Sequence, residues 1–554
     1  MKPKMQTKYF FVSAIFVMYF FLVSYLLRFN PDPHHDGILI SSGLMVANGL
    51  TPHLDFRFIW GPLLPYLLSI PLELSPNLYP LRIFGYVNLC ICAYQLYRLN
   101  RTIFLEHNAR QISLIWLVSF PPLSLLSYNS WPMAATVWPN TYAFLLILIA
   151  INTLLTAIRS VPKLAYIFFI FAGLLAFASV LIRINFITLF LAMAIYIYWL
   201  YGRSRQLIYF VLPGVFVLIG VYLFRYTNQV TSWYGDTFLS LSGDTESTGV
   251  PNFTVLGILR SILAIMLLAS LYVSALLIVY TSKSIARRYF ITLLLAITFF
   301  TSLVIARIKY DLFDIVLINK ATPWLQKSFS QIALGYIAAA LVLLVPLSIL
   351  NFRRNLLFNK SHPNNTLLGL LAFSSIPLNH NLNIDYIWIN SLFLISYVLL
   401  SIYLNYKWEI RSILMPSFVF CAISLILGLT SLTQSEIYSF QYDSLKFMKH
   451  KVAIAGNDLD QEMSLFYKIP ANATVKNNCS DSIYLSTNNN LILAGKSLMY
   501  ESNPYYSDRF EKANSDWVFE CNVGLSRLDE LKDKTRYMIS KNNGNFSVIY
   551  KPTT

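Results

Sequence analysis

The residues best suited to chemistry lie in one short polar segment, residues 31–67, between two apolar runs long enough to span a membrane. The segment contains Asp36 and Asp55 and three of the chain's seven histidines. The segment also contains Asp32, His34, His35, His53, Arg57 and Trp60. Ionisable residues held at a bilayer surface between spans are costly and usually functional. An ionised carboxylate that faces a dry cavity can take the proton from a hydroxyl group, which is general-base catalysis.

Asp36 and Asp55 are both candidates for this base. Residues 37–49 predict a short helix that starts just after Asp36, and the dipole at a helix N-terminus favours an ionised carboxylate. The alternative for Asp36 is a helix cap without chemistry. Asp55 could orient an acceptor or a phosphate-binding arginine, or it could only pair with Arg57 at the surface, an interaction worth ~0–1 kcal/mol.

The histidines and the tryptophan of this segment have less specific roles. His34, His35 and His53 are expected to form hydrogen bonds in the loop, because no carboxylate spacing around them makes a metal ligand set. We therefore expect no metal site and no cofactor. Trp60 could stack on a sugar or serve as an interfacial aromatic residue.

Cations that could bind a phosphate lie further along the chain. Arg183, in the sequence ASVLIRINF, falls at the outer end of a predicted span. It could bind the phosphate of a donor, or its side chain could extend to the lipid headgroups. Arg307 and Lys309, in the predicted outside loop 307–330, could bind the phosphate instead, or belong to a surface amphipathic helix.

The composition places these residues in a membrane protein. The chain has 554 residues, of which 56% are hydrophobic and only 12% charged, and its mean hydropathy is +0.55. Soluble chains contain about 25% charged residues. Apolar runs predict 13 transmembrane helices, at about 9–29, 79–97, 111–128, 133–157, 164–181, 184–201, 207–225, 254–280, 289–306, 331–351, 365–379, 386–405 and 412–433.

The distribution of charge predicts the orientation. With the N-terminus in the cytoplasm, 18 of the 28 Lys and Arg residues in 1–433 fall in inside segments, but only two of the 12 acids do. This orientation places the first loop, residues 30–78, and the tail, residues 434–554, outside the cytoplasm. The tail contains 14 basic and 14 acidic residues, so the net charge of +16 belongs to the membrane part. Such a charge reports orientation and anionic lipid, not nucleic acid.

The tail, residues 434–554, is predicted to be a small α+β domain. Residues 536–550 have the pattern of a hairpin and residues 457–468 that of a helix. A disulfide between Cys479 and Cys521 is plausible outside the cytoplasm.

The first loop resembles the GT-C superfamily of membrane glycosyltransferases, which includes protein O-mannosyltransferases and lipid A aminoarabinose transferases. The matching elements are an acid that opens the loop, then Val46-Ala47-Asn48-Gly49, Pro52-His53-Leu54-Asp55-Phe56 and Gly61-Pro62-Leu63. The resemblance covers about residues 30–100 and implies interfacial helices at 37–49 and 60–74. It also implies a basic residue in a position comparable to that of Arg183. Two features differ from the family: Asp36 is followed by Gly37 where many relatives have a glutamate, and the second outside loop, 128–132, has no acid.

The resemblance implies an enzyme that transfers a sugar from a polyprenyl-phosphate carrier to a glycan, lipid or protein acceptor, with inversion. We expect it to act on the outer face of a bacterial inner membrane. The sequence contains no glycine fingerprint of a nucleotide site, which agrees with a lipid-linked donor. Two alternatives are a surface-polysaccharide ligase or polymerase, and a lipid-linked-sugar transporter or flippase. The transporter would predict an internal repeat, and we find none in the sequence.

Overall fold

The computed structural model describes residues 19–21, 23, 35–47, 49–52, 58, 61–74, 78–118, 139–228, 347–375, 378, 392–406, 440–443, 446–449, 465, 468–470, 475–477, 492–494, 517–540 and 546–552.

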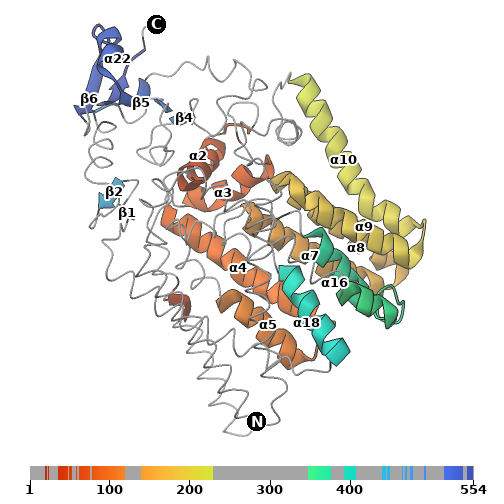
Figure 1. Ribbon diagram of the computed structural model, residues 1–554. Helices are drawn as coiled ribbons and strands as arrows, with labels where there is room; N and C mark the ends of the chain where they lie inside the picture. Colours follow the sequence, from red (N-terminus) through yellow and green to blue (C-terminus); the bar gives the residue numbers. More distant parts are fainter. Residues whose placement is uncertain are drawn as a thin grey trace, which may run out of the picture.

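Up to residue 406, the main elements of this part of the chain are helices (Figure 1). In chain order they are α2 (His35–Ala47), α3 (Leu63–Leu74), α4 (Leu78–Arg101), α5 (Glu106–Val118), α7 (Pro139–Arg159), α8 (Pro162–Ile182), the 3-10 turn η2 (Ile184–Phe186), α9 (Ile187–Tyr201), α10 (Arg205–Thr227), α16 (Pro363–Ser374) and α18 (Leu392–Tyr406). A further helical stretch covers 347–353. Figure 1 shows α2 and α3 lying together beside the start of α4. We call this end of the helices the loop end, and the opposite end the far end.

Four of the described helices are long and apolar enough to cross a membrane, and they confirm an integral membrane protein. They are Pro139–Arg159, Pro162–Ile182, Ile184–Tyr201 and Arg205–Phe224. Each matches one predicted span within a few residues. The predicted spans 254–280, 289–306 and 412–433 lie outside the described residues, as do most of 9–29 and of 331–351.

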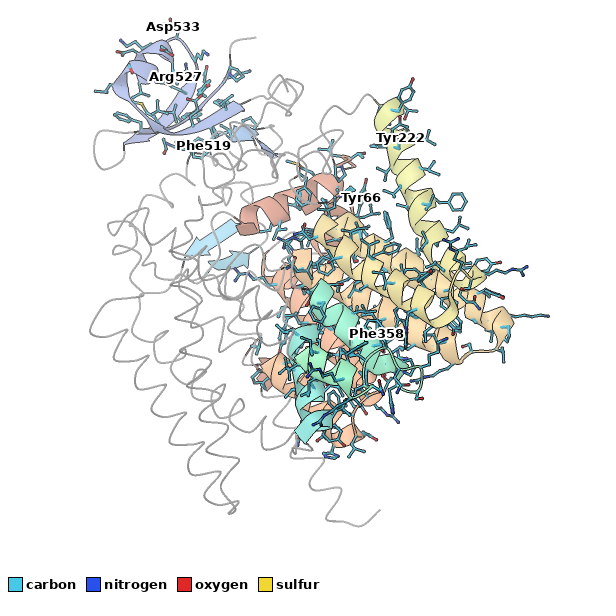
Figure 2. All side chains as sticks on the ribbon, turned by 45° about the vertical axis from the view of Figure 1, so that its right-hand side comes forward. Tyr66, Tyr222, Phe358, Phe519, Arg527 and Asp533 are labelled. Atoms are coloured by element: carbon cyan, nitrogen blue, oxygen red, sulfur yellow. The ribbon has the colours of Figure 1, made fainter. Side chains whose placement is uncertain are left out.

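The four helices differ in how much of their surface other helices cover. Two thirds of α7 is buried inside the bundle, whereas only 11% of α10 is. Figure 2 shows α10 projecting from the bundle, with Tyr222 on a turn away from the other described helices. An apolar helix with this exposure needs lipid or further helices around it.

One predicted span is shorter than expected. The sequence predicts a span at 365–379, but α16 ends at Ser374 and contains only 12 residues. At 1.5 Å per residue it is about 18 Å long, too short to cross a hydrocarbon core of ~30 Å alone. The Ser375 hydroxyl donates a hydrogen bond to the Ala372 carbonyl, and Pro377 follows in the sequence without an N–H to extend the helix.

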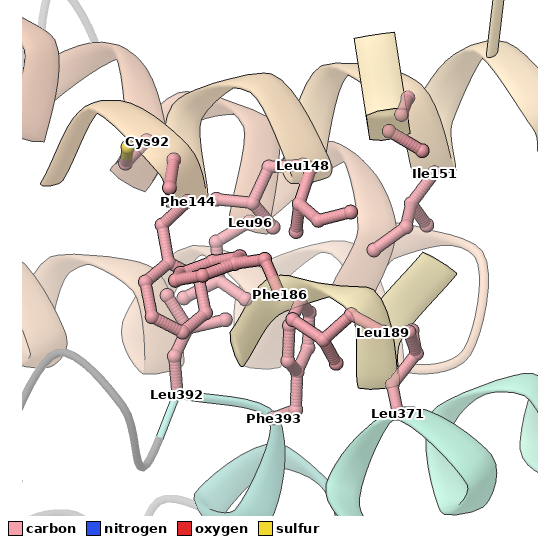
Figure 3. Packing of buried hydrophobic residues seen from close by; sticks show 14 of the residues in the cluster. Cys92, Leu96, Phe144, Leu148, Ile151, Phe186, Leu189, Leu371, Leu392 and Phe393 are labelled. Atoms are coloured by element: carbon pink, nitrogen blue, oxygen red, sulfur yellow. The ribbon is translucent and has the colours of Figure 1, made fainter. Parts of the chain in front are cut away.

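In the core of the bundle, Phe144, Phe186 and Phe393 pack among leucine and isoleucine side chains (Figure 3). The ring of Phe144 on α7 meets that of Phe186 edge-on at 4.9 Å between centroids, and it lies 5.9 Å from Phe393 on α18. Thr188 at the start of α9 donates a hydrogen bond of 2.6 Å to the Ser374 carbonyl of α16. Phe186 is fully buried, so the short connection between α8 and α9 is fixed in the core.

The described part of the tail contains a mixed five-stranded sheet with the order β4-β3-β5-β7-β6. Its elements are β3 (Val475–Asn477), β4 (Ile492–Ala494), β5 (Trp517–Val523), α22 (Leu525–Glu530), β6 (Arg536–Ser540) and β7 (Phe546–Tyr550), and a separate pair joins β1 (Phe440–Asp443) to β2 (Lys446–Lys449). β6 and β7 pair antiparallel, which confirms the hairpin predicted at 536–550. Most of the predicted helix 457–468, Cys479 and the side chain of Cys521 lie outside the described residues.

Candidate active site

α2 contains the first acidic candidate within its first turn. The sequence predicts a helix that starts after Asp36, but α2 begins at His35, so Asp36 is its second residue. The first four N–H groups of a helix have no carbonyl partner within it, so Asp36 can be part of the first turn without losing a hydrogen bond. A negatively charged side chain in the first turn also interacts favourably with the helix dipole. α2 ends in a Schellman motif: Gly49 has φ +84°, its N–H bonds the Val46 carbonyl at 2.8 Å, and that of Leu50 bonds the Met45 carbonyl at 3.0 Å.

α3 packs tightly against α2. A Cβ atom on Gly43 of α2 would lie 2.5 Å from Cδ1 of Leu72 and 3.0 Å from Cβ of Leu68 on α3, so a larger residue here would displace the Leu72 side chain. Leu64, Leu68 and Leu72 recur every four residues and are buried. The two helices predicted at 37–49 and 60–74 are therefore present and form one packed unit.

Gly61, just before α3, lies directly on the end of α8. Its N–H donates a hydrogen bond of 3.0 Å to the carbonyl of Ile182, the last residue of α8. A Cβ atom on Gly61 would lie only 1.9 Å from the Leu181 carbonyl oxygen. The Gly61-Pro62-Leu63 motif of the first loop thus meets the residue that immediately precedes Arg183.

Arg183 lies in an extended conformation, φ −150° and ψ 119°, between α8 and η2. Its N–H donates to the Ser179 carbonyl at 3.0 Å, and its own carbonyl accepts from the Phe186 N–H at 3.1 Å. The side chain is only 7% exposed, and its Nη1 donates a hydrogen bond to Oδ1 of Asn140. The guanidinium therefore turns toward Asn140 on α7.

Asn140 is a partner of Arg183 that the sequence analysis did not single out. It is the second residue of α7 and is buried. A neutral amide fixes the direction of the guanidinium through a hydrogen bond and adds no charge of its own. The only signal in the sequence is a Trp-Pro-Asn triplet, 138–140, at the start of an apolar run.

Arg82 is a second buried cation that the sequence analysis did not single out. It lies near the start of α4 and is completely buried. Two residues along, the ring of Phe84 stacks on Tyr142 at 6.2 Å between centroids. Because Tyr142 follows Asn140 closely, the second turn of α4 lies beside the first turn of α7.

Most of the predicted site residues lie outside the described part of the chain. They are His34, His53, Asp55, Arg57, Trp60, Arg307 and Lys309, together with the side chains of His35 and Asp36. Of the features singled out from the sequence, the structure brings together the Gly61 motif and Arg183. Among the described residues there is no group of three or more His, Cys, Asp or Glu that could hold a metal ion.

The chain is similar to solved membrane glycosyltransferases over almost its whole length. ArnT from Cupriavidus metallidurans bound to undecaprenyl phosphate is 13% identical, with a TM-score of 0.45 over 97% of this chain and 98% of that one. The apo state of the same protein is 12% identical to this chain, with a TM-score of 0.42 and the same coverage. The oligosaccharyltransferase of Archaeoglobus fulgidus tethered with an acceptor peptide is 13% identical, with a TM-score of 0.40 over 99% of this chain and 74% of that one.

No protein-family model and no curated protein matches the sequence. ArnT and the oligosaccharyltransferase are both GT-C glycosyltransferases, the superfamily that the first loop resembles in sequence. Because the identities and TM-scores are low, we base the function on the residues of this chain.

Proposed function

We propose that this protein is a membrane glycosyltransferase that takes a sugar from a polyprenyl-phosphate carrier and transfers it to a lipid, glycan or protein acceptor. The reaction takes place at the loop end, on the non-cytoplasmic face of a bacterial inner membrane, and needs no metal or cofactor. The observation that carries the proposal is the contact between the first loop and the end of α8, directly before Arg183. Gly61 of the loop that contains Asp36 bonds the carbonyl next to Arg183, at the end of a membrane-spanning helix.

A buried arginine at this position suits a phosphate that enters from the lipid. Its guanidinium is nearly enclosed and its direction is fixed by Asn140. In a medium of low dielectric constant, a cation attracts an anion far more strongly than it does in water. A polyprenyl chain would lie among apolar helix faces and bring its phosphate to this end.

The proposed reaction is a single displacement. Asp36 takes the proton from an acceptor hydroxyl, whose oxygen forms a bond to the anomeric carbon from the face opposite the phosphate. The bond from that carbon to the phosphate oxygen breaks, and the electron pair leaves with the carrier phosphate. Arg183 stabilises the charge that develops on this leaving group. The anomeric configuration inverts because there is one displacement and no covalent intermediate.

Transfer by the purified full-length chain in liposomes tests the proposal. The donors are radiolabelled undecaprenyl-phosphate pentoses and hexoses, and the acceptors are lipid and cell-envelope fractions of the producing cells. We expect label to move from one donor to an acceptor, with release of an equal amount of undecaprenyl phosphate, and an inverted anomeric configuration by NMR. Transfer from nucleotide sugars instead would contradict the proposal. Label that crosses the bilayer with the donor bond intact would favour the flippase alternative.

A further inference from the structure

Gly61 lies at the point where the first loop touches the end of α8, and its contact is made to the chain segment that leads directly into Arg183. We propose that Gly61 is a positioning residue for Arg183. The inference rests on the proposed function, in which Arg183 binds the phosphate of the donor.

The first support is steric. Besides the 1.9 Å contact with the Leu181 oxygen, a Cβ atom on Gly61 would lie 2.5 Å from the Leu181 carbonyl carbon and 3.0 Å from that of Ile182. All three atoms belong to the backbone, so a rotamer change cannot relieve the clash. Contacts below 3.0 Å essentially never occur for real Cβ atoms. Any side chain here must therefore move the loop and the end of α8 apart by about 1 Å.

The second support is hydrogen bonding. The last carbonyls of a helix have no partner within it and need donors from elsewhere. Gly61 N–H supplies one to Ile182 at 3.0 Å. The following peptide belongs to Arg183, which is tied back to Ser179 and forward to Phe186. A shift at Ile182 therefore moves the backbone of Arg183.

The third support is that the rest of the junction is fixed. Phe186 is fully buried against Phe144, and the Arg183 guanidinium is bonded to Asn140, also from α7. The residues after Arg183 cannot follow a displaced α8 end without leaving the core. The strain of a Gly61 side chain therefore falls on Arg183, which lies between the two fixed regions.

Gly61→Ala tests the proposal, and Gly173→Ala is its matched control. Gly173 lies on α8, and a Cβ atom on it would lie 1.9 Å from the Phe210 carbonyl oxygen of α10, a backbone clash as close as that of Gly61. Gly173 is about 12 Å along α8 from Leu181, at 1.5 Å per residue, where α8 meets α10. The control therefore reproduces the loss of packing at a distance from Arg183.

The kinetic measurement is transfer by full-length variants in liposomes as a function of donor concentration. A misplacement of about 1 Å can cost up to ~100-fold, so we expect Gly61→Ala to lower kcat/KM by roughly 10- to 100-fold, mainly through donor KM. Gly173→Ala should lower thermal stability but leave donor KM within about twofold, since distant sites act independently. Equal effects of the two variants on donor KM would reduce Gly61 to a packing residue and overturn the inference.

A double variant separates this inference from the proposed function. If Gly61 acts through Arg183, Gly61→Ala should add little to the donor KM of Arg183→Ala, whereas additive effects would contradict it. If Arg183→Ala leaves donor KM unchanged, the phosphate-binding role of Arg183 fails. The role of Gly61 is then decided by hydrogen exchange of the peptide that contains Arg183 and Phe186. Exchange should be faster in Gly61→Ala but not in Gly173→Ala, and unchanged exchange would overturn it.

The wild-type protein gives a test that does not depend on any variant folding. The Gly61 N–H should exchange slowly, because it is bonded to Ile182, a fully buried residue at the end of α8. Exchange as fast as that of a free amide would show that the contact does not persist, and the positioning role would be wrong.

Discussion

The loop end and the far end of the bundle each contain a buried polar cluster, and the two clusters differ in charge. At the loop end, a cation, Arg183, donates a hydrogen bond to the amide oxygen of Asn140, and the preceding residue, Ile182, accepts one from Gly61 of the first loop. At the far end, Asn351 donates to the hydroxyls of Tyr397 and Ser401 at 3.1 and 2.9 Å, and Ser348 lies 3.0 Å from Tyr397. All four of these side chains are neutral.

The difference in charge between the two clusters agrees with a phosphate-binding role for the loop-end cluster, as proposed above, and a structural role for the far-end cluster. Neutral hydroxyls and amides can satisfy one another within the bundle, and in a membrane such bonds hold helices together. Burying a guanidinium costs much more, because a charge loses its hydration. A buried cation beside the acid-containing loop is what the proposed phosphate-binding role requires, whereas the far-end cluster is explained by packing alone.

The largest expected effect comes from removing the base at the loop end. Asp36→Asn keeps the size of the side chain but cannot accept the proton, so kcat should fall by ~10²- to 10⁴-fold. Transfer assays at saturating donor measure this, with membrane insertion as the control for folding. Asp55→Asn should cost less if Asp55 only orients Arg57 or the acceptor. The reverse order would move the base to Asp55 and leave Asp36 as a helix cap.

The next effect concerns the cation itself. A hydrogen bond to a charged group contributes about 1.5–3 kcal/mol, so Arg183→Ala should weaken donor binding by roughly 10- to 150-fold. Arg183→Lys should recover part of this loss, because a phosphate accepts a point charge. Competition by undecaprenyl phosphate in nanodiscs measures the affinity. Unchanged affinity in Arg183→Ala would remove the distinction between the two ends of the bundle.

The far-end cluster should affect stability and not activity. Hydrogen bonds between membrane helices contribute about 0.6 kcal/mol each on average, so Asn351→Ala should cost about 1 kcal/mol. The Tm of the purified protein should fall by about 1–3 °C. Donor KM should stay at the wild-type value, because the cluster contains no charge. A change in KM as large as that of Arg183→Ala would show that the two clusters act together.

The smallest expected effect is that of metal removal. No acid stands in the second outside loop, 128–132, and the proposed leaving group is stabilised by an arginine. Transfer should therefore continue in EDTA at an unchanged rate. Activity that is lost in EDTA and restored by magnesium or manganese would show that carboxylates act as ligands, with Asp36 and Asp55 as the first candidates.

Several features of this protein follow from the sequence by itself. Helices at 133–157, 164–181, 184–201 and 207–225 could be predicted because a backbone in lipid must satisfy its own hydrogen bonds, so a long apolar run has to be helical. The two short helices of the first loop and the β6–β7 hairpin were also predicted from local patterns. The position of Arg183 at a helix end is a local property too, since it depends on where an apolar run stops.

Only the tertiary structure decided which of these local features meet. The bond between Gly61 and Ile182 and the one between Arg183 and Asn140 join segments that are far apart in the chain. Their formation depends on how the helices pack. Hydropathy does not predict this packing, because the lipid and the contacts between helices are equally apolar. For the same reason the sequence could not show that Gly61 must lack a side chain. That requirement comes from the carbonyl of a helix it meets only in the folded bundle.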